Sequence, residues 1–214
     1  IDRITFASDT STASARGSVT GRNGLGGTGN DTYGYYAGGG TPTNINAMST
    51  VNRITYTTDT DAASTRGPLS AAASYIAGTG TNNYGYFGGG VVSGPNLSTV
   101  NRVDYANDTP TTSVRGPLSS ARYGLAASTD STTYGWYMAG YTNIAPTDVL
   151  SRVDRITFAT DTATASIRGP LTIATYAISA AGDSNYGWVA GQSGSTIVNR
   201  ITYATDTATS TARG

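Results

Sequence analysis

The sequence predicts an all-β fold, specifically a β-propeller built from four-stranded blades of about 50 residues. A stretch that begins with Arg and ends with Arg-Gly occurs five times, and its two arginines are 13 positions apart in every copy. Successive copies begin 45 to 53 residues apart, a period typical of stacked or radial repeats. Lys, Glu, His and Cys are absent, whereas Thr, Ser, Gly, Tyr and Asn are abundant, which favours strands and tight turns over helices.

Each copy of this stretch is predicted to form a hairpin of two strands. In Arg53–Thr57, apolar Ile54 and Tyr56 alternate with polar residues, which is the period of a half-buried strand. The return strand Ala165–Arg168 alternates in the same way. A turn with one Asp joins the two strands, and we expect its side chain to bond to its own backbone. These aspartates are Asp9, Asp59, Asp108, Asp161 and Asp206.

Ten of the thirteen arginines occupy the two fixed places of the five copies. A guanidinium offers several donors to strand-end carbonyls and to Asp, so a repeated structural tie is favoured over a ligand-binding fork. Metal binding by the turn aspartates is the weaker alternative, because only one Asp recurs per copy. The pairs are Arg3 and Arg16, Arg53 and Arg66, Arg102 and Arg115, Arg155 and Arg168, and Arg200 and Arg213.

Two further strands complete each period. An aromatic segment that ends in glycines recurs at 33–40, 84–90, 134–140 and 186–191. It follows a segment of small apolar residues, seen at 75–78, 123–127 and 176–180, which suits a crowded innermost strand. The aromatic residues recur in register and are predicted to pack between blades rather than to bind a ligand. They are Tyr35, Tyr86, Trp136 and Trp188.

The chain is therefore predicted to be a single repeat domain, residues 1–214, of four blades and one extra hairpin. The blades are expected at 18–66, 67–115, 116–168 and 169–214, and variable loops at 41–52, 91–101, 141–151 and 192–199. The half-blade hairpin at 1–17 has no inner strand pair of its own. This predicts that the chain was cut from a longer repeat polypeptide; the alternative is that the hairpin docks on an exposed sheet edge, in its own chain or in a neighbour.

The layout resembles kelch repeats over the whole chain. Kelch repeats have an Arg shortly before a small-residue strand, then Gly-Gly, then a Tyr-Asp-x-x-Thr segment. The counterparts are Gly116–Arg122, which leads into the strand at Tyr123, then Gly88–Gly90, and then Asp104–Thr109 with the order of Tyr and Asp reversed. The resemblance implies a propeller.

The chain departs from the kelch pattern at two places. The Trp of the outer strand is replaced by residues such as Ser113 and Ser166, and the Arg122 position is expected to hold Ser74 and Thr175 in other copies. Near-identical repeats of this kind are also similar to those of bacterial surface proteins and phage fibres, which implies an extracellular or virion location.

The absent residue types exclude most chemistry. Without His or Cys there is no Ser-His-Asp triad, no thiol nucleophile and no ordinary zinc or copper site, so the copper oxidases related to kelch proteins are excluded. Without Lys, Schiff-base chemistry is excluded, and without Glu any catalytic pair of carboxylates must be Asp–Asp. No enzymatic activity, cofactor or metal is expected. The zero net charge disfavours nucleic-acid binding, and no apolar run approaches the length needed for membrane insertion.

The sequence therefore predicts a non-enzymatic structural or adhesive repeat module of an extracellular assembly, such as a phage tail fibre or a cell-surface filament. Its expected partners are other protein subunits or further repeats of the same polypeptide. The alternative is a carbohydrate-binding, lectin-like propeller whose loop aromatics stack on sugar rings. Tyr141, in a variable loop, is the candidate glycan contact.

Overall fold

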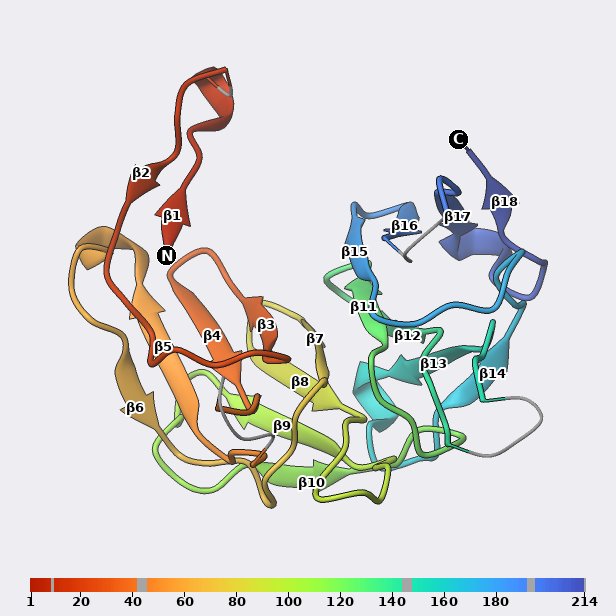
Figure 1. The fold of residues 1–214 in the computed structure, drawn as a ribbon, viewed down its shortest axis with the longest axis horizontal. Helices are drawn as coiled ribbons and strands as arrows, with labels where there is room; N and C mark the ends of the chain where they lie inside the picture. The colour runs from red at the N-terminus through yellow and green to blue at the C-terminus, as the bar shows by residue number, and fades with distance from the viewer. Residues whose placement is uncertain (9, 42–45, 144–147, 192–194, 214) are drawn as a thin grey trace.

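The computed structural model describes residues 1–8, 10–41, 46–143, 148–191 and 195–213. Within these ranges the chain forms strands and short 3-10 turns and no α-helix, so the predicted all-β class is confirmed. Four four-stranded antiparallel sheets make the blades of a propeller, preceded by a two-stranded hairpin (Figure 1). No helix in the described ranges is long and apolar enough to cross a membrane. The turn residue Asp9 and the prolines Pro42 and Pro146 of the predicted loops lie outside the described residues.

The strands of each sheet follow one another in chain order. The N-terminal hairpin consists of β1 (Asp2–Arg3), the 3-10 turn η1 (Phe6–Ser8) and β2 (Ser14–Ala15). Blade 1 consists of β3 (Gly26–Gly29), β4 (Tyr33–Ala37), β5 (Val51–Thr55), η2 (Tyr56–Thr58) and β6 (Ser64–Arg66). Blade 2 consists of β7 (Ala77–Gly80), β8 (Tyr84–Gly88), β9 (Val100–Asp104) and β10 (Ser113–Arg115). Blade 3 consists of β11 (Ala126–Thr129), β12 (Tyr134–Met138), β13 (Val153–Thr157), η3 (Phe158–Thr160) and β14 (Ser166–Arg168). Blade 4 consists of β15 (Ser179–Gly182), β16 (Tyr186–Ala190), β17 (Asn199–Thr202), η4 (Tyr203–Thr205) and β18 (Thr211–Ala212).

The innermost strands β3, β7, β11 and β15 lie side by side in chain order, so the blades follow one another around a common centre. The small residues predicted for these strands allow this close approach; in β7, a Cβ added at Gly78 would collide with the backbone of Gly27 in β3. In Figure 1 the N-terminal hairpin and blade 4 stand apart, on the two sides of an opening.

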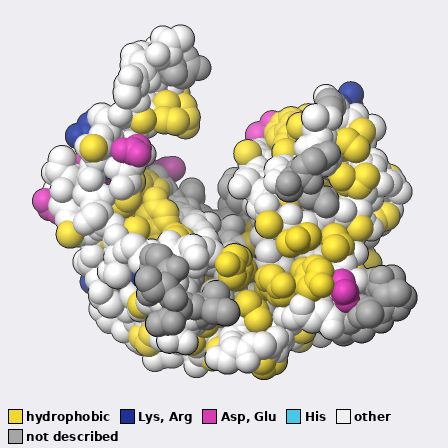
Figure 2. Space-filling view, in the orientation of Figure 1, with side chains coloured by type: hydrophobic (Ala, Val, Ile, Leu, Met, Phe, Trp, Pro, Cys, Tyr) yellow, Lys and Arg dark blue, Asp and Glu magenta, His cyan; other side chains and the backbone are white. Residues whose placement is uncertain are grey.

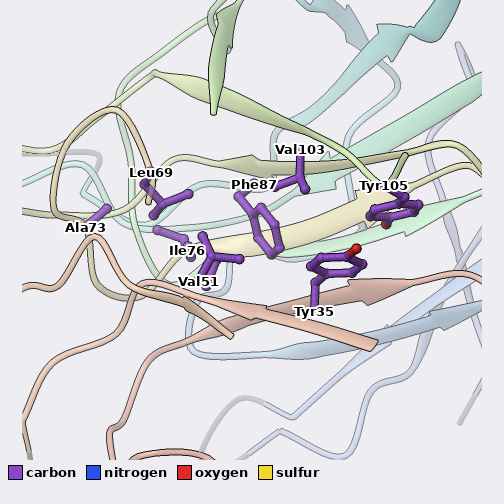
Figure 3. Packing of buried hydrophobic residues seen from close by; sticks show 9 residues of the cluster. Tyr35, Val51, Leu69, Ala73, Ile76, Phe87, Val103 and Tyr105 are labelled. Carbon is purple, nitrogen blue, oxygen red and sulfur yellow. The ribbon is translucent and has the colours of Figure 1, made fainter. Parts of the chain in front are cut away.

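Apolar side chains form one core cluster between each pair of neighbouring blades. Figure 3 shows the first of these clusters, where the ring of Tyr35 from blade 1 stacks on Tyr105 from blade 2 with centroids 4.6 Å apart. Trp136 stacks on Tyr203 in the same way at 3.8 Å. Tyr35, Tyr86 and Trp136 are completely buried, which confirms that these aromatics pack between blades. Trp188 is only half-buried, because no further blade packs against it in this structure.

The same polar contact accompanies the aromatic stack at each junction between blades. At the junction of blades 1 and 2, Asp108 of blade 2 accepts bonds from two groups of blade 1: Arg53 at 2.8 Å and the hydroxyl of Tyr35 at 2.8 Å. Nε of Arg66 lies 3.5 Å from the same carboxylate oxygen. We call this set the inter-blade ion cluster. It recurs around Asp161 and around Asp206, where Nε1 of Trp136 replaces the Tyr hydroxyl.

The ion clusters confirm that the repeated arginines are structural ties, but they correct the prediction for the aspartates. The side chain of Asp108 does not bond to its own turn; it binds the arginines of the preceding copy. The two arginines of the N-terminal hairpin contact Asp59 of blade 1 in the same manner, at 3.0 and 3.4 Å. The hairpin therefore occupies the place of the outer half of a blade.

In the first four copies, the glycine that follows the second Arg of the hairpin lies directly against the next copy. The backbone N–H of Gly116 donates to the carbonyl of Asp161 at 2.8 Å, and a Cβ added there would collide with the carbonyl oxygen of Ala163. Gly67 and Gly169 are placed in the same way against the following blades. The Arg-Gly pair is thus explained by one feature: the Arg reaches the aspartate, and the missing side chain of Gly lets the two backbones meet.

Two predictions for the hairpin strands are wrong in detail. Strand β5 ends at Thr55, and Tyr56 begins a 3-10 turn from which its ring lies across Gly34 of the neighbouring strand. In the return strand β14, Ile167 is 59% exposed rather than half-buried, and this strand is the outermost of the blade. Strands β5, β9 and β17 also begin inside the segments predicted as loops.

The expected equivalence of Ser74 with Arg122 is also wrong by one residue. The carbonyl of Arg122 accepts a bond from Gly90, and the matching acceptor in blade 2 is Ala73. Thr175 occupies this position in blade 4, as predicted. In blade 1 the position holds Arg22, whose Nη2 donates to a carbonyl of β4 at 3.1 Å, as Arg122 does to β12 at 3.2 Å. An Arg is therefore present at this position in two blades.

Arg122 forms a completely buried ion pair with Asp154 of the same blade, with Nη1 2.8 Å from the carboxylate. The carboxylate also accepts bonds from the backbone N–H and hydroxyl of Ser119. The other three blades have Asn in place of Asp154. Burial lowers the pKa of Arg122, and the neighbouring carboxylate opposes this shift.

Candidate functional site

Four tyrosines form a continuous row at one end of the innermost strands. The ring centroids of Tyr75 and Tyr123 are 5.9 Å apart, and those of Tyr123 and Tyr141 are 5.5 Å apart. Tyr141 is in turn 5.4 Å from Tyr176. The rings come from three consecutive blades, and Tyr176 is exposed whereas the other three are half-buried. We call this set the tyrosine row.

The backbone beneath the row is a chain of hydrogen bonds between blades. The N–H of Tyr75 donates to the carbonyl of Gly24, Gly124 donates to Tyr75, and Ala177 donates to Gly124, at 2.6 to 3.0 Å. All four residues have a positive φ, between 53° and 64°. Glycine adopts this conformation readily, whereas a Tyr there is strained by about 1 kcal/mol or more. A bulky aromatic side chain kept in such a position points to a role for its ring.

Tyr141, the residue predicted from the sequence as a glycan contact, is held firmly in the row. Its backbone pairs with Tyr123 through two hydrogen bonds of 2.9 and 3.1 Å. Its hydroxyl donates to Asp148 at 3.2 Å, and this bond is the main cause that raises the pKa of the Tyr141 phenol. The phenol is therefore neutral at physiological pH, and the ring is held between those of Tyr123 and Tyr176.

A pocket of about 350 Å³ opens beside the row, between blades 2 and 3. The rings of Tyr75 and Tyr123 form part of its wall, together with Asn143 and small residues. The side-chain amide of Asn143 donates to Asn96 at 3.2 Å, and Asn96 donates to the carbonyl of Tyr141 at 3.4 Å. The pocket thus combines aromatic faces with the amide of Asn143, a composition suited to a small polar ligand that also has an apolar face.

The structure brings Tyr141 together with three tyrosines that the sequence predicted only as the starts of small-residue strands. Tyr141 itself does not line the pocket. A signal for this grouping was present: the innermost strand runs antiparallel to the aromatic strand, so the start of one must meet the end of the other. In blade 3 this places Tyr123 beside Tyr141.

In the part of the chain that the structure describes, the acidic side chains do not form a metal site. Among the residues that it describes, no three His, Cys, Asp or Glu side chains cluster in a way that would hold a metal ion. The turn aspartates Asp108, Asp161 and Asp206 are engaged with arginines. No protein-family model matches the chain, and no curated protein matches it.

Proposed function

We propose that this protein is a non-enzymatic structural or adhesive repeat module of an extracellular assembly, such as a phage tail fibre or a cell-surface filament. One observation carries the proposal: the inter-blade ion cluster and its aromatic stack recur at successive junctions with nearly the same geometry. Contacts that are repeated in this way make a rigid array with no moving part. A rigid scaffold that displays loops suits a structural or adhesive role.

The composition supports a passive role. The residues most used in acid–base and nucleophilic catalysis are missing from the chain, apart from Asp, Tyr and hydroxyl groups. The recurring aspartates are tied to arginines inside the junctions. The array also has a kelch-like character, because Arg22 and Arg122 each lie before an innermost strand and bond to the adjacent aromatic strand.

Immunoelectron microscopy of the source cells and of particles released from them tests this role. Antibodies raised against the 214-residue chain are expected to label filaments or fibres outside the cell envelope. Label confined to the cell interior would overturn the proposal. Preimmune serum on the same samples is the control.

Carbohydrate binding at the tyrosine row is a second candidate function. It is favoured by a specific observation: four aromatic rings lie together beside a pocket whose wall includes the amide of Asn143. The apolar face of a sugar ring stacks on such aromatic faces, and each stacked ring contributes on the order of 1 kcal/mol to binding.

A glycan array tests this second function. Saturable binding to a defined glycan is expected, with a loss of about tenfold or more in affinity when Tyr123→Ala or Tyr141→Ala removes a ring of the row. Val114→Ala is the control, because Val114 is an exposed apolar residue outside the row. The absence of binding to any glycan, or equal losses in all three variants, would refute it.

A further inference from the structure

The tyrosine row is not a simple product of the repeat. The place of Tyr75 in the backbone chain of hydrogen bonds is held by a glycine in blades 1 and 3. Tyr123 pairs with Tyr141 in blade 3, where blade 2 has the pair of Ser74 with Val91. The rings therefore come from different places of the repeat, and duplication of a blade does not by itself bring them together.

The row places phenol rings from three blades in contact with one another. Neighbouring ring centroids are 5.4 to 5.9 Å apart, and the ring planes are inclined to each other by 51° to 63°. This spacing is that of aromatic rings in direct contact. An electron passes readily between rings in contact, so a radical formed on one tyrosine of the row can move to the next.

Tyr141 has beside it the group that its oxidation requires. A phenol that loses an electron becomes a strong acid, so a base at the hydroxyl makes the oxidation easier. The hydroxyl of Tyr141 donates to Oδ2 of Asp148 at 3.2 Å. The other oxygen, Oδ1, is buried and has no hydrogen-bond partner in the described part of the chain. The carboxylate of Asp148 is therefore placed to take up the phenolic proton.

The pocket beside the row gives a small oxidant access to the tyrosines. It has a volume of about 350 Å³, and the rings of Tyr75 and Tyr123 form part of its wall. Figure 2 shows that side chains of the hydrophobic class, to which Tyr belongs there, reach the surface on the face drawn. An electron can thus leave the row at the pocket while the proton leaves at Tyr141.

The closer tyrosine pair at the junction of blades 1 and 2 lacks these features. The rings of Tyr35 and Tyr105 stack with centroids 4.6 Å apart, but both residues are buried. The hydroxyl of Tyr35 shares its acceptor Asp108 with Arg53 at 2.8 Å. A cation so near the ring opposes the removal of an electron from it. We therefore expect this pair to be protected from oxidation.

We propose that the tyrosine row is a site of oxidative modification, at which Tyr141 forms a dityrosine cross-link with Tyr123 or Tyr176. Each of the two phenols loses one electron and one proton. The two radicals couple through a carbon–carbon bond between the positions ortho to their hydroxyls, and the two ortho hydrogens move to the phenolic oxygens. Hydrogen peroxide, acting through a haem peroxidase, takes up the two electrons and two protons and leaves as two water molecules.

The cross-link gives the chain a covalent tie between segments far apart in its sequence. The chain has 15 Tyr but no Cys for a disulfide and no Lys for an amide cross-link. A bond from Tyr141 to Tyr176 joins blade 3 to blade 4, and a bond to Tyr123 joins the loop after β12 to the start of the innermost strand. The inference does not depend on the proposed function, because a rigid array needs no covalent link.

Treatment of the dilute 214-residue chain with hydrogen peroxide and a haem peroxidase tests the inference. The monomer is expected to acquire the blue fluorescence of dityrosine and to lose the mass of two hydrogen atoms. Mass spectrometry of its peptides is expected to identify Tyr141 linked to Tyr123 or to Tyr176. The chain without peroxide is the blank.

Three variants separate the parts of the proposal. Tyr141→Phe keeps the ring and removes the hydroxyl, and it is expected to abolish the cross-link. Asp148→Asn keeps an acceptor for that hydroxyl but removes the base, and it is expected to slow cross-linking by about tenfold or more. Tyr56→Phe is the matched control, because Tyr56 is an exposed tyrosine outside the row. Circular dichroism verifies the fold of each variant.

Several results would overturn the inference. They are a monomer without dityrosine, dityrosine found only between chains, a link that does not include Tyr141, and equal yields in the wild type and Tyr141→Phe. An unchanged rate in Asp148→Asn would show that the carboxylate is not the base. The outcome is separable from glycan binding, since Tyr141→Phe retains the ring on which a sugar would stack.

Discussion

At the scale of single residues, lack of space explains the glycine that follows the second arginine of a hairpin. The Arg-Gly pair is visible in the sequence, but the reason for the Gly is not, because its neighbour lies about 50 residues away in the chain. The spacing of Tyr56 from Arg53 predicts a strand residue. In the structure the backbone instead turns at Tyr56, and the ring of Tyr56 packs over Gly34. Arg22 was missed because the segment between Gly17 and Arg22 is one residue shorter than that between Gly116 and Arg122.

The close approach at Gly116 gives a stability prediction. Gly116→Ala is expected to lower the free energy of unfolding by about 1 to 3 kcal/mol, because the added methyl group must displace the carbonyl of Ala163 in the next hairpin. Gly21→Ala is the matched control, since a Cβ there meets no atom within 4 Å. Chemical denaturation of both variants is the measurement, and equal midpoints would show that the added methyl group at position 116 causes no steric strain.

At the scale of elements, hairpins and blades were predictable because their patterns are local. Alternation and glycine placement predicted the four strands of each period, and all four blades have them. The partner of each Asp was not predictable, because a turn residue that bonds to its own backbone and one that bonds to the previous blade have the same sequence. The grouping of the tyrosine row depends likewise on the register between neighbouring strands, which no single segment encodes.

The ion clusters differ in burial and in their number of donors. We therefore expect that replacing their aspartates lowers the free energy of unfolding by different amounts. Asp161→Asn is expected to cost about 3 kcal/mol, because it leaves Arg102 and Arg115 without a charge partner in a largely buried site. Asp59→Asn is expected to cost about 1 kcal/mol or less, because its partner Arg3 is half exposed and the hairpin supplies no aromatic donor. Urea denaturation of the two variants compares them directly, and similar losses would show that the aromatic donor and burial add nothing.

At the scale of the whole molecule, the tyrosines between blades set its response to alkaline pH. The chain has 15 Tyr and no Lys or Cys. Burial raises the pKa of Tyr203 to about 12, and desolvation also raises the pKa values of Tyr35, Tyr86 and Tyr105. A folded-state pKa above the unfolded value of about 10 means that the folded chain holds the phenolic proton more tightly.

Stability is therefore expected to be complete below about pH 10 and to fall as the pH rises toward 12. Tyr203→Phe is expected to make this decline shallower, because it removes one phenol with a raised pKa and keeps the stacked ring. The ring should fit, since Phe158 occupies the same place in blade 3. Denaturation midpoints followed between about pH 8 and pH 12 provide the measurement. A variant that declines as steeply as the wild type would show that Tyr203 plays no part.

The uniform chemistry of the junctions also bears on how such a chain changes in evolution. If residues 67–115 were lost, Arg53 and Arg66 of blade 1 would meet Asp161 in place of Asp108, and Tyr35 would meet Phe158 in place of Tyr105. Recombination between near-identical gene segments can therefore add or remove a whole blade without creating a mismatched seam. Blade number becomes a heritable variable that selection can adjust in single steps.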